Sequence, residues 1–243
     1  MALCEAIGLS RRFGGNVALQ DVTLRLEPAT IVALIGPNGS GKTTLFNLLA
    51  GQLRPSAGTV RWRGRDITDW PPHRRCRAGI NRTFQVARPF LDLTLRENVA
   101  LGLLYGRPLE AVGRCGALAR AQDVLGDIGL AAKAGEAARD LSLGELKRLE
   151  LAMAVATQPA LLLIDEVLAG QSPIAAQEIL AYLARLRAQG SAICLVDHRL
   201  QALLAVADRA VALHQGRVIA EGRPEAVTKS PVVLEAYLGE PGR

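Results

Sequence analysis

The stretch Gly36-Pro37-Asn38-Gly39-Ser40-Gly41-Lys42-Thr43 decides the fold of this chain. It matches G-x-x-x-x-G-K-[ST] at every position. A short apolar run (30–35) precedes it and a helical pattern (43–50) follows, which is the setting that a phosphate-binding loop requires. Its glycines let backbone N–H groups converge on phosphate oxygens, and the helix N-terminus adds a partial positive charge. A chance glycine-rich turn is the alternative, but it would not need both flanks.

Two acidic residues follow a second apolar run. Residues 161–164 predict a buried strand, and Asp165 and Glu166 come directly after it. Enzymes with a phosphate-binding loop hold Mg²⁺ through such a carboxylate, together with the loop hydroxyl, here Thr43, while the loop lysine, Lys42, reaches the β- and γ-phosphates. Glu166 could polarise an attacking water as a general base. On its own this pattern is weak, since many strands end in an acidic residue.

The rest of the chain alternates between strand and helix patterns. Residues 22–26 and 60–62 predict strands, and residues 192–196 predict another buried one. Residues 94–156 are rich in Ala, Leu, Glu and Arg and predict several helices. A hairpin is expected around Gln215-Gly216. This order indicates an α/β core that carries an inserted helical segment.

Composition excludes several classes of protein. The 243 residues are 49% hydrophobic and 21% charged, which excludes global disorder. The longest uncharged stretches run 14 residues, too few to span a bilayer. The N-terminus lacks a basic start and a long apolar run, so we expect no signal peptide and a cytoplasmic chain.

The charge and the cysteines carry less information. The net charge is +6, and eight arginines lie between Arg61 and Arg88. Such a segment can bind an anionic partner, but with 4% aromatic residues a solvated surface is the preferred interpretation. The four cysteines lack zinc-site spacing, so free thiols are expected.

A further motif gives a specific resemblance. The stretch Leu141-Ser142-Leu143-Gly144-Glu145, upstream of Asp165, resembles the LSGGQ-type signature of ATP-binding cassette (ABC) ATPases. Other marks of that family follow in order: Phe13 resembles the aromatic that stacks on adenine, Gln85 the Q-loop glutamine and His198 the switch histidine, with 169–172 at the D-loop position.

Each of these marks also has a structural interpretation. Phe13 could belong to the core, Gln85 could be a surface residue and His198 a satisfied structural histidine. Ser142 could simply cap a helix. Order and spacing together favour the functional interpretation.

The resemblance implies a fold. It predicts a P-loop NTPase core with an antiparallel β subdomain and an inserted helical subdomain. Together these form one nucleotide-binding domain, residues 1–243. The core would comprise about 1–87 and 158–243, and the helical subdomain about 88–157.

The resemblance also implies cofactors and site residues. Cassettes of this family work as head-to-tail pairs with ATP and Mg²⁺, and the signature of one covers the nucleotide of the other. The implied nucleotide-binding residues are Phe13, Gly36, Pro37, Asn38, Gly39, Ser40, Gly41, Lys42, Thr43, Thr44, Ser142 and Gly144. The implied metal ligands are Thr43, Gln85 and Asp165, and the implied catalytic residues are Glu166, His198 and Gln85.

Within the family, the sequence most resembles the cassettes of branched-chain amino-acid importers. The supporting segments are FGGNVAL (13–19), GPNGSGKTTLFN (36–47), PHRR (72–75), GINRTFQ (79–85), RLELAMAVAT (148–157) and AYLGE (236–240). The implied partners are a second cassette, identical or different, two polytopic permease subunits and, indirectly, an extracytoplasmic solute-binding protein. No nucleic acid is expected, and the chain would sit peripherally on the cytoplasmic face of the inner membrane.

A partner surface and two alternative functions complete the expectations. Residues 88–99 would line the groove for a permease helix, with Phe90, Leu91 and Leu93 partly exposed or packed into the insert. One alternative is a soluble ABC ATPase acting on nucleic acid or ribosomes, and another is a small-molecule kinase. The single phosphate-binding loop and the signature disfavour them.

Several positions depart from the family pattern. Val167 stands where proline usually follows the catalytic glutamate, Gln171 where leucine is usual, and Arg199 where aspartate is common after the histidine. We expect hydrolysis to survive with an altered rate, because Lys42, Asp165, Glu166 and His198 are all present. The departures bear on the geometry of the D-loop, and so on the coupling between the two sites of a pair.

Overall fold

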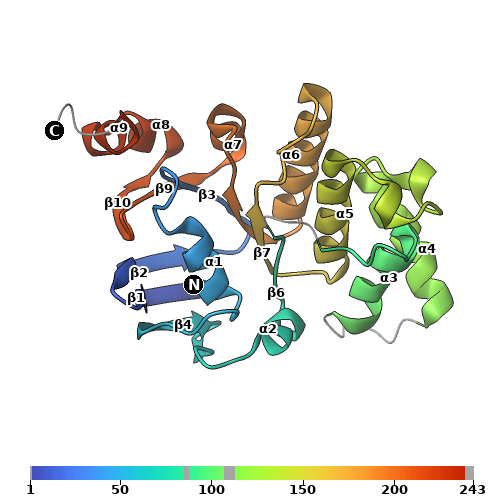
Figure 1. Ribbon diagram of the computed structural model, residues 1–243, viewed down its shortest axis with the longest axis horizontal. Helices are drawn as coiled ribbons and strands as arrows, with labels where there is room; N and C mark the ends of the chain where they lie inside the picture. Colours follow the sequence, from blue (N-terminus) through green and yellow to red (C-terminus); the bar gives the residue numbers. More distant parts are fainter. Residues whose placement is uncertain (1, 85–87, 107–112, 239–243) are drawn as a thin grey trace.

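Two sheets and a set of helices make up the computed structural model, which describes residues 2–84, 88–106 and 113–238 (Figure 1). The first sheet has the strand order β2-β1-β4-β5, and its pairs are antiparallel. Its strands are β1 (Cys4–Phe13), β2 (Asn16–Leu26), β4 (Ala57–Trp62) and β5 (Arg65–Asp66). The strands expected at 22–26 and 60–62 are confirmed.

The second sheet carries the loops that matter for function. Its order is β10-β9-β3-β8-β7-β6, and all pairs are parallel except the β9–β10 hairpin. Its strands are β3 (Ile31–Ile35), β6 (Ile80–Arg82), β7 (Leu161–Asp165), β8 (Ala192–Val196), β9 (Arg209–His214) and β10 (Arg217–Gly222). Because parallel strands end at one edge, the loops after β3, β7 and β8 meet there.

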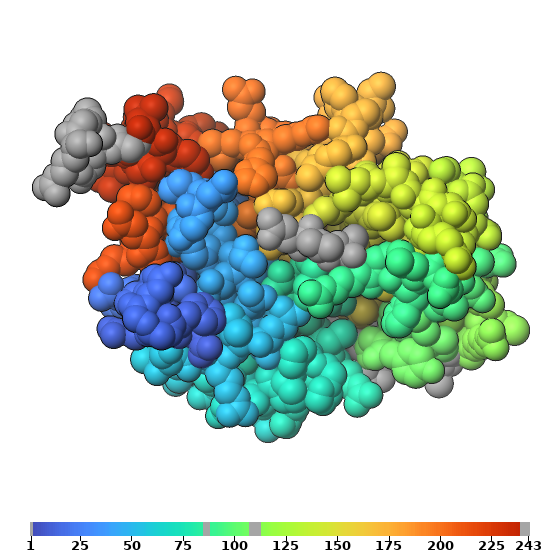
Figure 2. Space-filling view, viewed as in Figure 1, coloured from blue at the N-terminus to red at the C-terminus, as the bar shows by residue number. Residues whose placement is uncertain are grey.

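Helices pack around this second sheet. In the first third of the chain these are α1 (Lys42–Leu49), which packs between the two sheets, and α2 (Pro72–Ala78). The others are α3 (Leu95–Tyr105), α4 (Arg114–Asp127), α5 (Leu143–Ala156), α6 (Pro173–Ala188), α7 (Leu200–Val206), α8 (Pro224–Thr228) and α9 (Pro231–Leu238). Figure 2 shows α3 to α5, green to yellow, on one side of the molecule and the blue antiparallel strands on the other. Within the described ranges, none of the helices combines the length and apolar character that crossing a bilayer needs.

The buried strands separate two hydrophobic cores. Along β3, the side chains of Val32 and Leu34 join one core with α1 and the antiparallel sheet. Ile31 and Ala33 point to the other face and join a core with α3 to α6. A strand with apolar groups on both faces reads as a continuous apolar run, which is why 30–35 lacks polar alternation.

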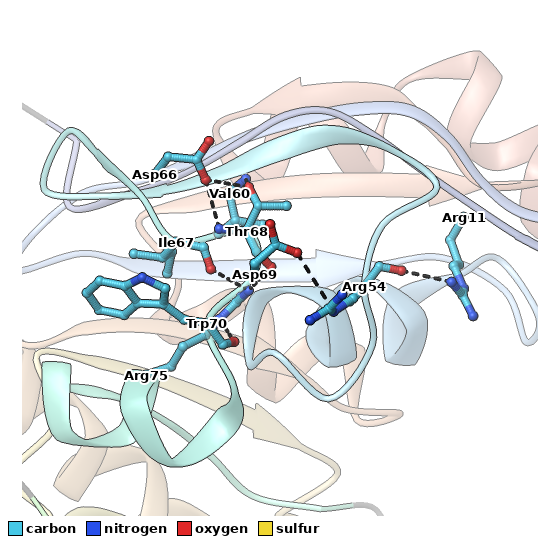
Figure 3. Close-up of polar contacts among 9 residues, drawn as sticks. All are labelled: Arg11, Arg54, Val60, Asp66, Ile67, Thr68, Asp69, Trp70 and Arg75. Atoms are coloured by element: carbon cyan, nitrogen blue, oxygen red, sulfur yellow. Dashed lines mark hydrogen bonds and ion pairs between the residues drawn. The ribbon is translucent and has the colours of Figure 1, made fainter.

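Two arginines of the arginine-rich segment, Arg75 and Arg82, are not on the surface. Arg75 on α2 is fully buried. Figure 3 shows its guanidinium reaching the carbonyls of Ile67, Thr68 and Trp70, at 2.8, 2.8 and 3.1 Å. It also donates to Leu48 and Leu49 at the end of α1, at 2.7 and 2.8 Å. The solvated-surface interpretation is therefore wrong for Arg75, and also for the buried Arg82.

The cysteines are free thiols, as expected. Cys4 and Cys194 are buried in the core, and burial raises the pKa of each to about 12. They therefore act as small apolar groups rather than as reactive thiolates.

Candidate functional site

The phosphate-binding loop connects β3 to α1 and depends on glycine at both ends. A Cβ on Gly36 would lie 2.0 Å from the Leu213 carbonyl oxygen. At Gly41, φ is 108°, and a Cβ would lie 2.7 Å from the Ala18 carbonyl oxygen. Gly41 is the N-cap of α1, and no side chain caps the helix there. The first-turn N–H groups of α1 are thus available for an anion.

Lys42 folds over this loop. Its Nζ donates to the carbonyls of Gly36 and Pro37, at 2.7 and 2.8 Å. Burial lowers the pKa of the Lys42 ammonium, while the nearby Asp165 and Glu166 raise it. The loop therefore holds a cation directly beside two carboxylates.

A cavity of about 410 Å³ opens between this loop and the ends of β7 and β8. Its lining brings together most of the predicted residues: Asn38, Gly39, Gly41, Lys42, Thr43, Thr44, Asp165, Glu166 and His198, with Asn16, Val17, Ala18 and Val196. Gly36 and Pro37 line an adjoining pocket of about 240 Å³, and Ser40 is buried beneath the loop. The predicted loop residues, Asp165, Glu166 and His198 thus lie around one cavity and the pocket next to it.

Asp165 has an unsatisfied oxygen. Its carboxylate is buried, and Oδ2 accepts no hydrogen bond from the described residues. The Arg82 Nη2 lies 3.6 Å from this Oδ2. Burial raises the pKa of Asp165, and Arg82 opposes that rise. A buried carboxylate oxygen that accepts no hydrogen bond in the described part of the chain, on a cavity that Thr43 also lines, suits a hard divalent cation.

Glu166 and His198 face each other across the site. The distance from His198 Nε2 to Glu166 Oε1 is 3.0 Å. Glu166 adopts φ 53°, an unfavourable conformation for a residue with a Cβ. Its N–H donates to the Val196 carbonyl at 2.8 Å, which fixes this conformation against β8. Backbone strain of this kind is concentrated at functional sites.

Phe13 and the signature residues lie outside the cavity lining. Phe13 is 45% exposed, pairs across the hairpin with the lining residue Asn16, and stacks under the Arg11 guanidinium at 4.7 Å. The core interpretation of Phe13 is therefore wrong. Ser142 and Gly144 start α5 and, within the described chain, do not line this cavity. The helix-capping interpretation of Ser142 is confirmed: its Oγ accepts from the Glu145 N–H at 3.4 Å. Gln85 lies outside the described residues.

A second, apolar groove lies between β6 and the helices. Its volume is about 480 Å³, and its lining includes Phe84, Arg88, Phe90, Tyr105 and Glu150. Of the three apolar residues expected there, Phe90 lines it; Leu91 is exposed elsewhere and Leu93 is partly buried.

Sequence reasoning missed two residues that support the site. Arg82 lies 3.6 Å from Asp165 Oδ2 and donates to Asn47 Oδ1 at 2.5 Å, which links the Asp165 carboxylate to α1. The Tyr237 hydroxyl accepts from the Gly36 N–H at 2.7 Å, which joins α9 to the phosphate-binding loop. In the sequence, Arg82 is marked only as the first residue of RTFQ and Tyr237 only as part of AYLGE. Neither pattern indicates which residue each side chain contacts.

The fold and this site define a P-loop ATPase of the cassette type, and comparisons agree. The family model described as "ABC transporter" matches residues 19–169, and the model described as "Branched-chain amino acid ATP-binding cassette transporter" matches residues 217–242. The chain belongs to the ABC transporter family, as an ATPase that is the ATP-binding subunit of a transporter. The sequence-based family and fold predictions are confirmed.

Three relatives illustrate the similarity. The chain is 38% identical over 250 residues to the high-affinity branched-chain amino acid transport ATP-binding protein LivG of Escherichia coli K12, with 98% of each covered. It is 35% identical to the corresponding protein BraF of Pseudomonas aeruginosa, again with 98% of each covered. A solved ATP-binding cassette of an ABC transporter in its ADP conformation superposes with a TM-score of 0.86 at 30% identity, covering 99% of this chain and 100% of that one.

Proposed function

We propose that the cavity at the end of β3 holds ATP with Mg²⁺ and hydrolyses it to drive the import of branched-chain amino acids or related small solutes. The observation that carries this proposal is the convergence of Lys42, the unsatisfied Asp165 carboxylate and the Glu166–His198 pair on one cavity. The cargo rests on the likeness to LivG and BraF.

Each residue has a chemical task in this proposal. The loop from Gly36 to Thr44 binds the phosphates, and Lys42 leaves its carbonyl partners for the β- and γ-phosphate oxygens. Thr43, Asp165 and Gln85 hold Mg²⁺, which when bound neutralises charge on those phosphates. Phe13 stacks on the adenine.

Hydrolysis then depends on the pair across the site. Glu166 takes a proton from the attacking water, and His198 keeps the carboxylate oriented and contacts the γ-phosphate. Positioning and charge stabilisation supply the catalysis, so no covalent intermediate on the protein is needed.

Pairing completes the site. Because Ser142 and Gly144 start α5 away from the cavity of their own chain, we infer that they cover the nucleotide of a second cassette, head to tail. The second cassette is either a copy of this chain or a different cassette. We infer the same subdivision as the sequence predicts: a core of about 1–87 and 158–243 and a helical subdomain of about 88–157.

The apolar groove is the proposed contact with the membrane subunits. Phe90 is 57% exposed and Tyr105 71% exposed, although both line the groove. Exposed aromatic groups beside charged ones suit a protein interface. The chain would therefore sit peripherally on the cytoplasmic face of the inner membrane, bound to two permease subunits, with an extracytoplasmic solute-binding protein as an indirect partner.

The test separates binding from hydrolysis. Purified protein, alone and co-purified with its membrane partners, is assayed for ATP binding and Mg²⁺-dependent hydrolysis. The Glu166→Gln variant should bind ATP normally and lose hydrolysis, and Asp165→Asn should lose the Mg²⁺ dependence of binding. Hydrolysis that survives in Glu166→Gln would contradict the proposed mechanism.

A further inference from the structure

Two of the residues that depart from the family pattern form one connected structure. The Gln171 side chain is buried, and its Nε2 donates to the Gly144 carbonyl at 2.7 Å. The backbones also meet there, because a Cβ on Gly144 would lie 2.8 Å from the Gly170 carbonyl oxygen. The start of α5 is thus in direct contact with the loop between β7 and α6.

Arg199 connects this contact to the loop of the switch histidine. Its Nη2 donates to the Gln171 carbonyl at 2.6 Å. Asp197 adds a second link, since its Oδ2 accepts from the Leu168 N–H at 2.9 Å and its Oδ1 accepts from the Arg199 N–H at 3.0 Å. The loop that carries His198 is therefore tied at two points to the loop that follows Glu166.

We propose that Gln171 and Arg199 are positioning residues that transmit the state of the γ-phosphate site to the signature helix of the same chain. The proposal rests on the proposed function, in which His198 contacts the γ-phosphate and Ser142 and Gly144 serve a second cassette. It adds the path between them, namely His198, Arg199, Gln171 and the Gly144 carbonyl.

The chemistry of the two side chains supports this path. Arg199 is the residue next to His198, so a shift of the imidazole displaces its backbone directly. The 2.6 Å bond from Arg199 to the Gln171 carbonyl passes this displacement to Gln171. The 2.7 Å bond from the Gln171 side-chain amide passes it on to the Gly144 carbonyl. Leucine at 171 would fill the same buried space without a donor, and aspartate at 199 would place a negative charge where the Gln171 carbonyl now accepts a hydrogen bond.

Hydrogen exchange on the full chain tests the proposal. The protein is kept at a concentration at which sedimentation shows a monomer, so that no second cassette covers α5. Exchange of the backbone amides in the first turns of α5 is compared with Mg·ADP and with Mg²⁺ and the β,γ-imido analogue of ATP. The wild type should exchange at different rates in the two states. Arg199→Ala and Gln171→Leu should lose that difference, while Arg199→Lys, which keeps a donor for the carbonyl, should retain it.

The controls distinguish this inference from the proposed function. Arg185→Ala removes another exposed arginine, paired with Asp127 at 3.2 Å, and should behave as wild type. Nucleotide affinity and thermal unfolding are measured for every variant. If the wild type binds no nucleotide, the proposed function fails. If it binds and shows no γ-phosphate-dependent difference in α5, or if Arg199→Ala keeps the difference, the path through Arg199 and Gln171 is overturned.

Discussion

At the scale of single residues, Arg75 places a charge in the core without exposing it to water. All five of its N–H groups donate to backbone carbonyls, two of them at the C-terminal end of α1. A cation there also complements the negative end of the helix dipole. Burial lowers the pKa of the guanidinium, with Cys4, Asp66 and Asp69 opposing the shift. The residue thus fixes the far end of the helix that carries Lys42.

Substituting Arg75 should therefore cost stability rather than chemistry. Arg75→Met keeps the apolar stem but removes the donor from five carbonyls, of which, among the described residues, only Leu48 and Ile67 still accept a backbone N–H, from Gly51 and Trp70. We expect the free energy of unfolding to fall by at least about 2 kcal/mol, since each buried unsatisfied group costs about 1–3 kcal/mol. Urea denaturation measures this, with the exposed Arg77→Met as the matched control. An equal loss in both variants would show that the buried bonds do not matter.

Glu150 gives a prediction about pH. It is buried beside the apolar groove and accepts from the Phe84 N–H at 2.8 Å, and burial raises its pKa from 4.5 to about 7. Between these values the folded protein binds the additional proton, so this group makes the protein less stable as pH rises. Relative to wild type, Glu150→Gln should leave the free energy of unfolding unchanged at about pH 4.5 and should increase it above about pH 7.

Urea denaturation of both proteins at about pH 5 and about pH 8 tests the direction of this pH dependence. Glu235→Gln, an exposed substitution on α9, is the control. A stabilisation of Glu150→Gln that is the same at both pH values would rule out the titration of Glu150 as its source.

At the scale of elements, α3 and α5 begin in the same way. Thr94 and Ser142 are N-caps, and each forms a capping box with a glutamate three residues later. The Lys133 ammonium, 2.8 Å from Glu145, and the Ser142 hydroxyl hold the pKa of Glu145 at about 2. The start of α5 is therefore held by an ion pair as well as by its cap.

Comparing substitutions at these two N-caps distinguishes the capping role of Ser142 from a role in ATP hydrolysis. Ser142→Ala and Thr94→Ala should each reduce the free energy of unfolding by about 1 kcal/mol. Only Ser142→Ala should also lower the rate of ATP hydrolysis, because only α5 carries the signature. Equal ATPase rates in the two variants, with equal losses of stability, would show that Ser142 acts as a cap alone.

The contact between α9 and the phosphate-binding loop gives another prediction. Tyr237→Phe removes the hydroxyl that accepts from the Gly36 N–H and should weaken ATP binding, with a loss of stability of about 1 kcal/mol. Calorimetric titration measures the affinity, and Leu238→Ala, at a position 84% exposed, is the control. An unchanged affinity in Tyr237→Phe would confine α9 to a structural role.

Local patterns predicted the elements but not their long-range partners. The strand at 30–35, the loop at 36–43 and the hairpin around Gln215-Gly216 follow from composition and spacing over a few residues. Arg82 could not be placed in this way, because a buried arginine and a solvated one look alike in a run of arginines. The pairing of Gln171 with Arg199 joins positions far apart in the chain, so each looked like an isolated departure from the family pattern.

At the scale of the whole molecule, two hydrophobic cores meet at one parallel sheet, and the site lies at the edge where its strands end. The core with α1 fixes the phosphate-binding loop, and the core with α3 to α6 fixes the signature helix and the groove. The proposed nucleotide site and the proposed partner groove therefore depend on different halves of the structure. This arrangement suits a pair of chains in which the γ-phosphate favours the closed arrangement and hydrolysis allows the pair to open.

The most direct measurement is ATP-driven uptake of leucine into vesicles that contain this chain together with the proposed partners: a second cassette, two permease subunits and a solute-binding protein. With wild-type protein, we predict leucine accumulation that requires Mg·ATP and the apolar groove. With Glu166→Gln, accumulation should stop although the complex still assembles and binds ATP. Accumulation that continues in Glu166→Gln, or a wild-type complex that hydrolyses ATP without moving leucine or related solutes, would contradict the account.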